Sequence, residues 1–179
     1  MLLARSDNPL EKGISALGDR RFEDAIGQFT EAIKGVADAF FYRGVAQYEL
    51  QHYEQAARDF DTFSALNPTN PAGLVNKGAA LGALNRNEEA IAVYDEVLSR
   101  FGSATEPPLR QVAMALVNKG VALGAINRNE EAIAVYDEVL SRFGSATEPA
   151  LQQQVARALF NKEGRAGRVQ SERGGNCGL

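Results

Sequence analysis

Apolar residues recur along most of this chain at intervals of three and four positions, which is the period of an α-helix. One such stripe runs through residues 116–123, and a second runs through residues 132–140. A short polar segment, Asn127-Arg128-Asn129, separates them. The pattern therefore predicts two amphipathic helices that are joined by a tight turn and pack together through their apolar sides.

The same pair of stripes is repeated along the chain. Residues 74–107 match residues 116–149 at an offset of 42, with Ala79/Val121 and Leu84/Ile126 as the only differences. Each copy, including two weaker ones nearer the N-terminus, places a Gly twelve residues before an Ala and an aromatic residue four residues after that Ala. We expect the Gly and Ala where two helices cross closely, with the aromatic side chain filling the space beside them. The four sets are Gly13/Ala25/Phe29, Gly44/Ala56/Phe60, Gly78/Ala90/Tyr94 and Gly120/Ala132/Tyr136.

These residues resemble the tetratricopeptide repeat family. In that family a small residue, an Ala, an aromatic residue and a Pro occupy positions 8, 20, 24 and 32, as Gly44, Ala56, Phe60 and Pro68 do in segment 37–70. The last two copies resemble the longer, 42-residue variant of the repeat. The resemblance implies an all-α fold, a right-handed α-solenoid of stacked antiparallel helix pairs. It covers residues 6–162, with repeats near 6–36, 37–70, 71–108 and 109–149 and a terminal helix at 149–162.

The resemblance also implies a binding surface. The first helix of each repeat in this family lines a concave groove, in which a peptide or a helix of a protein partner binds. The groove of one subgroup grips chaperone C-termini with a Lys and an Asn, but Leu10 and Ile14 occupy those positions here, so this clamp is not expected. The predicted groove residues are Leu10, Ile14, Phe41, Tyr42, Val45, Tyr48, Val75, Asn76, Ala79, Val117, Asn118, Val121 and Asn161.

Two interpretations of the groove side chains stay open at this point. The aromatic residues Phe41 and Tyr48 could anchor an apolar side chain of a partner, without a role in holding the fold together. The amides of Asn76, Asn118 and Asn161 could bind the backbone of an extended peptide. They could equally bridge adjacent helices within the array, in which case they would contribute nothing to recognition.

Composition and charge narrow the possible functions. A net charge of −4 argues against a nucleic-acid partner, and no apolar run is long enough to span a membrane. The lone Cys177 permits no internal disulfide, and no secretory signal is evident, so we expect a cytoplasmic protein. The single His52 lies in a predicted turn, and no phosphate-binding loop is present, so we expect no metal, no cofactor and no catalysis.

The C-terminal segment departs from the repeat. Residues 163–179 show no apolar stripe, and we expect them to be disordered and dispensable. Reading their possible codons one nucleotide later permits a close copy of the next repeat, so we infer an out-of-frame remnant. The last helix thus loses its partner helix, which leaves Leu159 and Phe160 uncovered.

For the chain as a whole, we expect a scaffold that binds a protein or peptide. The alternative is a self-associating repeat array, with a weak homodimer through the C-terminal helix.

Overall fold

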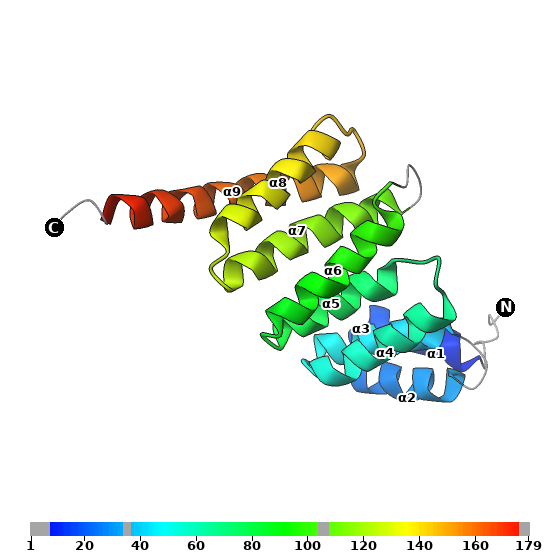
Figure 1. The fold of residues 1–179 in the computed structure, drawn as a ribbon. Helices are drawn as coiled ribbons and strands as arrows, with labels where there is room; N and C mark the ends of the chain where they lie inside the picture. Colours follow the sequence, from blue (N-terminus) through cyan, green and yellow to red (C-terminus); the bar gives the residue numbers. More distant parts are fainter. Residues whose placement is uncertain (1–7, 34–36, 104–107, 176–179) are drawn as a thin grey trace. The chain divides into compact units, whose positions relative to one another are not determined.

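Helices joined by turns and short loops make up the part of the chain that the computed structural model describes, which is residues 8–33, 37–103 and 108–175, with side chains up to residue 171. Nine helices and no strand lie in those ranges (Figure 1). The helices are α1 Pro9–Gly18, α2 Phe22–Ala32, α3 Asp38–Glu49, α4 Tyr53–Leu66, α5 Ala72–Ala83, α6 Asn87–Phe101, α7 Leu109–Ala125, α8 Asn129–Phe143 and α9 Pro149–Gly175.

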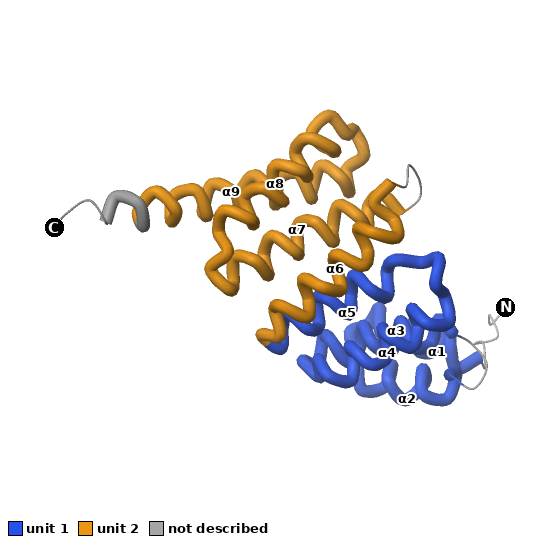
Figure 2. Tube along the Cα trace, in the orientation of Figure 1, with its two compact units in different colours: residues 1–84 blue, residues 85–179 orange. Residues whose placement is uncertain are grey.

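The helices are divided between two units, coloured separately in Figure 2. Unit 1, residues 1–84, contains α1 to α5, and unit 2, residues 85–179, contains α6 to α9. Within each unit, helices that follow one another along the chain pack against each other. The predicted hairpins of the first, second and fourth repeats are therefore present as α1–α2, α3–α4 and α7–α8. The division between the units lies inside the predicted third repeat, between α5 and α6.

Four short turns between consecutive helices each contain one residue with left-handed backbone geometry. Arg20, Gln51, Asn85 and Asn127 have φ values between 59° and 63°. Asn adopts this conformation more readily than most other non-glycine residues, and Asn85 and Asn127 occupy this position in the two nearly identical repeats. The polar turn predicted at 127–129 is confirmed at its first two residues, and α8 begins at Asn129.

The packing within each hairpin depends on a ring that lies against a glycine. A Cβ atom added to Gly13 would lie 2.5 Å from Cε1 of Phe29, and one added to Gly120 would lie 2.5 Å from Cε1 of Tyr136. The corresponding distance from Gly44 to Cε1 of Phe60 is 2.8 Å. Carbon atoms do not approach so closely, so only glycine fits. The Ala residues of these three hairpins are fully buried, which confirms the predicted close crossing: Ala25, Ala56 and Ala132.

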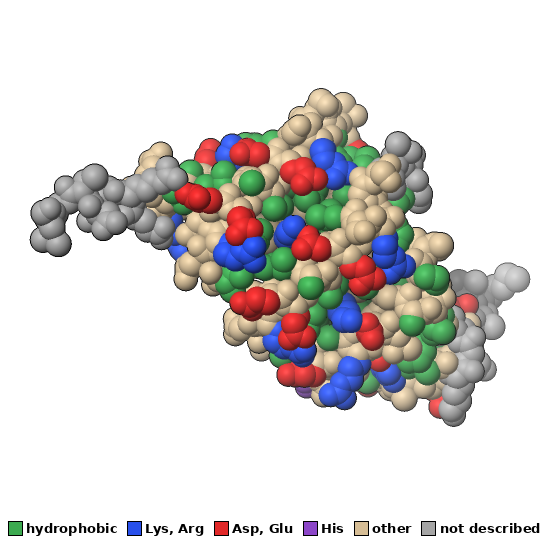
Figure 3. Space-filling view, viewed as in Figure 1, with side chains coloured by type: hydrophobic (Ala, Val, Ile, Leu, Met, Phe, Trp, Pro, Cys, Tyr) green, Lys and Arg blue, Asp and Glu red, His purple; other side chains and the backbone are tan. Residues whose placement is uncertain are grey.

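Three ion pairs between Lys and Asp link neighbouring helices: α4 with α5, α6 with α7, and α8 with α9. In each pair a Lys that follows an Asn on one helix reaches back to an Asp on the helix before it, and in two of the pairs the repeat glycine comes directly after the Lys. The carboxylates are half exposed or more, so each pair contributes only about 0.2–1 kcal/mol. On the face drawn in Figure 3, acidic and basic side chains accordingly lie interspersed. The pairs are Lys77–Asp61, Lys119–Asp95 and Lys162–Asp137, each 2.5 Å apart.

Helix α9 differs from the prediction at its C-terminal end. We expected a helix over 149–162 and then a disordered tail, whereas α9 continues as one helix to Gly175. The expectation of disorder is therefore wrong for 163–175. This segment contains no Pro and no Asn, and its Arg, Ala, Gln and Glu residues favour a helix enough to tolerate its glycines. The proposed out-of-frame origin stays a prediction, and residues 176–179, which include Cys177, lie outside the described residues.

Arg165 explains why the extension packs on unit 2. Its guanidinium donates to the backbone oxygen of Gly124 at 2.8 Å and to Oδ1 of Asn129 at 3.3 Å. Gly124 lies in the last turn of α7, where helix carbonyls carry partial negative charge and favour a cation. A side chain that the sequence suggested was part of an unpacked tail therefore ties α9 to the turn between α7 and α8.

We predict that Gly120→Ala destabilises the protein because its new methyl group meets the buried ring of Tyr136. The expected loss is about 1–3 kcal/mol in the free energy of unfolding, measured by urea denaturation. Gly27→Ala is the matched control, because Gly27 is a helical glycine with no atom within 4 Å of the added Cβ. The control should be neutral or more stable by up to about 1 kcal/mol. Equal effects of the two substitutions would contradict the assigned contact.

We also predict that Arg165→Ala lowers the free energy of unfolding by about 1–2 kcal/mol, because two polar contacts of a charged donor are lost. Arg168→Ala, on an exposed residue one turn further along α9, should change it by less than about 0.5 kcal/mol. Urea denaturation of both variants tests this prediction. Identical stabilities would mean that 163–175 behaves as the dispensable tail that the sequence suggested.

Candidate functional site

The structure places the predicted groove residues of unit 1 on α1, α3 and α5, and it gives them different surroundings. Leu10 and Tyr42 pack on a core cluster that includes Ala16, Ala25 and Phe29. Phe41, Val45 and Tyr48 pack on a second cluster that includes Ala56, Phe60 and Ala80. Ile14 is 43% exposed, and Asn76 and Ala79 are half-buried.

Phe41 is more a part of the core than the sequence suggested. Its ring centroid lies 5.0 Å from that of Phe63 and 5.7 Å from that of Phe60. Tyr42 likewise stacks on Phe29, with ring centroids 5.7 Å apart. Such contacts between rings stabilise a hairpin directly. The expectation that Phe41 serves only as an anchor for a partner is therefore wrong.

Tyr48 and Val45 are better placed to meet a partner. Tyr48 is half-buried and makes an edge contact with the ring of Tyr53, with centroids 5.1 Å apart. Burial raises the pKa of the Tyr48 phenol, and the nearby Tyr53 and Glu49 raise it further. The hydroxyl therefore keeps its proton at neutral pH and can donate a hydrogen bond.

Two predicted groove residues are buried and have no exposed surface for a partner. Val75 on α5 is 2% exposed, and Val117 on α7 is 0% exposed. They occupy equivalent positions of the two nearly identical repeats, so this position serves internal packing. The expectation that they contact a partner is wrong. Val121, four residues after Val117 on α7, remains 41% exposed.

The predicted row of Asn side chains does not behave as one set. In unit 1, Nδ2 of Asn76 donates to the carbonyl of Ala72 in its own helix at 2.8 Å. In unit 2, Oδ1 of Asn118 accepts a hydrogen bond from Nη2 of Arg157 at 3.3 Å, which links α7 to α9. Asn161 on α9 is half-buried. The bridging interpretation therefore holds for Asn118.

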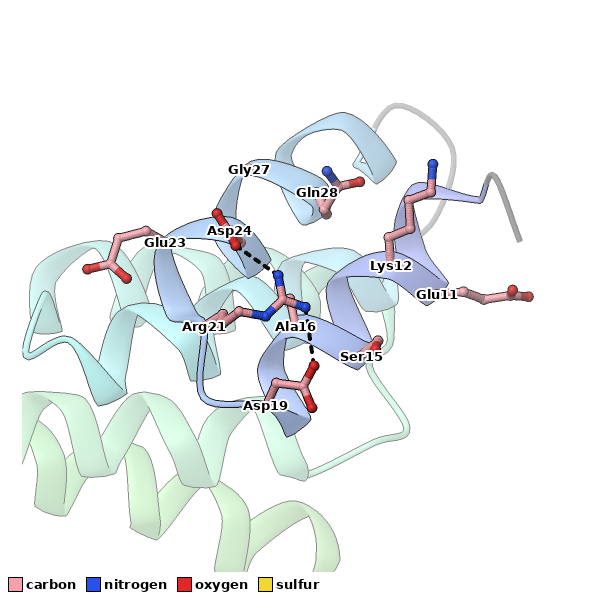
Figure 4. Close-up of a pocket in the computed structure, with 10 residues that line it drawn as sticks. All are labelled: Glu11, Lys12, Ser15, Ala16, Asp19, Arg21, Glu23, Asp24, Gly27 and Gln28. Carbon is pink, nitrogen blue, oxygen red and sulfur yellow. Dashed lines mark hydrogen bonds and ion pairs between the residues drawn. The ribbon is translucent and has the colours of Figure 1, made fainter. Parts of the chain in front are cut away.

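The sequence did not suggest the hollow beside α1 and α2, which has a volume of about 760 Å³ (Figure 4). Arg21 crosses it and donates to Asp24 at 2.8 Å and to Asp19 at 3.2 Å. The hydrogen bond to Asp19, and then the one to Asp24, raise the already high pKa of the guanidinium. The residues that line it are Glu11, Lys12, Ser15, Ala16, Asp19, Arg21, Glu23, Asp24, Gly27 and Gln28.

A comparison of the first two repeats explains the polar lining of this hollow. Glu11 and Ser15 in the first repeat take the positions of Tyr42 and Ala46 in the second. Ala46 is fully buried, and Tyr42 packs on the ring of the preceding hairpin. In the first hairpin, polar residues therefore occupy the face that in the second hairpin packs on the hairpin before it, and such a face is compatible with water.

Two features are absent from the part of the chain that the structure describes. Within it, no group of three or more His, Cys, Asp or Glu side chains is arranged to hold a metal ion. In the same ranges, every helix is too short or too polar to cross a membrane.

Comparison with known proteins agrees with this geometry. The tetratricopeptide repeat family model matches residues 10–71, 41–105 and 75–147. The chain is 32% identical over 116 residues to small glutamine-rich tetratricopeptide repeat-containing protein 2 of Saccharomyces cerevisiae, over 63% of this chain and 34% of the yeast protein. A thermophilic repeat protein of Thermus thermophilus is 17% identical with a TM-score of 0.62, over 92% of this chain and 89% of that chain. A tetratricopeptide repeat protein from Parabacteroides merdae is 17% identical with a TM-score of 0.68, over 91% and 60%.

Consecutive antiparallel helix pairs, each closed by a ring against a glycine, define a helical-repeat protein, and the predicted α-solenoid class is confirmed. The chain belongs to the tetratricopeptide repeat family. This fold supports a general role as a scaffold for protein–protein interactions. The chain spans about a third of the length of the yeast relative that it matches.

The ring contacts of Phe41 generate a prediction about stability. Phe41→Ala should lower the free energy of unfolding by about 2–4 kcal/mol, since the side chain leaves a gap beside Phe60 and Phe63. Leu66→Ala, on a residue that is 55% exposed, should cost less than about 1 kcal/mol. Urea denaturation of both variants measures the difference. A Phe41 variant as stable as the control would restore this residue to a role in binding alone.

Proposed function

We propose that the protein is a non-catalytic scaffold, and that unit 1 binds an apolar peptide or helix of a protein partner across α1 and α3. The observation that carries the proposal is the accessible apolar surface on these two helices, which contact each other. Ile14 on α1 is 43% exposed, and Val45 and Tyr48 on α3 are half-buried. Ile14 and Val45 occupy equivalent positions of successive repeats, so the exposed side chains lie in register.

The support beneath these side chains suits them to binding. Val45 and Tyr48 rest on a cluster formed by Ala56, Phe60 and neighbouring residues, so their positions are fixed before a partner arrives. A preordered surface loses little conformational entropy on binding, which favours affinity. The apolar side chains supply contact area, and the Tyr48 hydroxyl supplies one directional hydrogen bond. A partner segment with two or three apolar side chains on one face fits this combination.

Self-association is the competing hypothesis. The C-terminal helix α9 exposes Leu159 and Phe160, as the sequence analysis expected, and a second copy could cover them. However, α9 contains five Lys or Arg residues and two Glu residues, so two copies of this helix in contact would repel each other. We therefore prefer the scaffold function to self-association. A protein partner rather than a nucleic acid, and a cytoplasmic location, remain parts of the proposal.

Selection from a phage-displayed library of random peptides tests the proposal. Peptides selected on the full chain should carry apolar residues on one face, and Ile14→Asp should weaken their binding at least tenfold. Leu66→Asp is the control, because Leu66 is 55% exposed on α4. Fluorescence anisotropy with labelled peptides measures both. If the Ile14 variant binds as tightly as the unsubstituted chain, the proposed surface is wrong.

A further inference from the structure

Helix α9 has one side that the described residues leave uncovered. Leu159 and Phe160 of α9 align with Leu116 and Val117 of α7, because the Asn-Lys pair that follows is the same in both helices. The two residues of α7 are 0% exposed. Leu159 is 44% exposed and Phe160 is 78% exposed. Apolar positions that other helices cover in α7 are thus open to solvent in α9.

The glycines of α9 are open as well. In the α1–α2, α3–α4 and α7–α8 hairpins, the repeat glycine lies under an aromatic ring, as at Gly120. In α9, Gly164 and Gly167 have no atom within 4 Å of an added Cβ, and they lie one and two turns beyond Phe160. A hollow of about 300 Å³ adjoins the first of them. It is lined by Phe160, Asn161, Glu163, Gly164, Arg165 and Arg168.

Charge indicates what kind of segment would fit this side. The second helices of the repeats are all acidic, with net charges of −3 for α2, −2 for α4 and −3 for both α6 and α8. Helix α9 has a net charge of +3, the most basic of the chain. It meets acidic α8 on one side, where Lys162 pairs with Asp137. On the open side, Arg168 is exposed and beside the hollow.

We propose that the open side of α9 is a docking site for an acidic amphipathic helix of a partner protein, distinct from the surface proposed on unit 1. An apolar side chain of that helix enters the hollow over Gly164 and packs on Phe160. A carboxylate about one turn away pairs with Arg168. Exposed Arg168 beside the hollow, together with the net charge of +3 on α9 as a whole, favours an acidic helix on this side over a second copy of α9.

A peptide with the sequence of residues 129–143 is a suitable probe, since α6 and α8 share this acidic sequence and α8 packs against α7 and α9. The labelled peptide is titrated with the full chain and followed by fluorescence anisotropy. We expect saturable binding that weakens at least tenfold with Phe160→Ser or Arg168→Glu, and that falls as salt is raised. A peptide whose four acidic residues are replaced by Gln or Asn should bind at least tenfold more weakly.

Leu66→Ser is the matched control, because it removes an exposed apolar side chain from unit 1 and should leave the affinity unchanged. Circular dichroism of each variant checks that the helical content is retained. No saturable binding, or binding that Phe160→Ser leaves intact, overturns the proposal. It is also overturned if the chain alone sediments as a dimer that Phe160→Ser dissociates, because a second copy then occupies this side.

Discussion

The contact between an aromatic ring and a glycine on the facing helix sets the spacing in three of the hairpins of this protein. The ring atoms lie where a Cβ would stand on Gly13, Gly44 or Gly120, so the two helices approach as closely as their backbones allow. A glycine within a helix costs about 0.5–1 kcal/mol relative to Ala. Full burial of a Phe side chain stabilises the folded state by about 1.5–3 kcal/mol, which exceeds the cost of the glycine. The small Ala on the second helix follows from the same close approach.

The first hairpin and the last helix that the structure describes differ in the side chains that they expose. At the N-terminal end, Glu11 and Ser15 replace apolar residues of the next repeat, and Arg21 is held between two carboxylates. The polar and charged side chains of this surface are compatible with exposure to water. On α9, Phe160 remains exposed, and no aromatic ring lies against Gly164 or Gly167. This difference is the reason that we propose a docking site on α9 rather than at the hollow beside α1 and α2.

Equivalent positions of a repeat acquire different roles according to what lies next to them. Val75 and Val117 are internal packing residues, whereas Phe160 at the equivalent position of α9 is exposed. Asn118 is bonded to Arg157, whereas Asn76 is bonded within its own helix. The surface available for recognition in unit 1 is consequently narrower than the repeat pattern suggested, and Ile14, Val45 and Tyr48 are central to it.

The sequence alone determined the helices, the hairpins and the residues at their crossings, because these depend on apolar periodicity and on side-chain size at fixed spacing. Gly120, Ala132 and Tyr136 could be assigned to one crossing from their intervals. Burial of Val117 and the ring contacts of Phe41 were decided only by the tertiary structure, since they depend on which helices lie alongside. The same holds for the end of α9. Local composition suggested disorder after residue 162, but Arg165 donates a hydrogen bond to Gly124 in the last turn of α7. The two residues are 41 positions apart in the sequence, so a local pattern cannot reveal their contact.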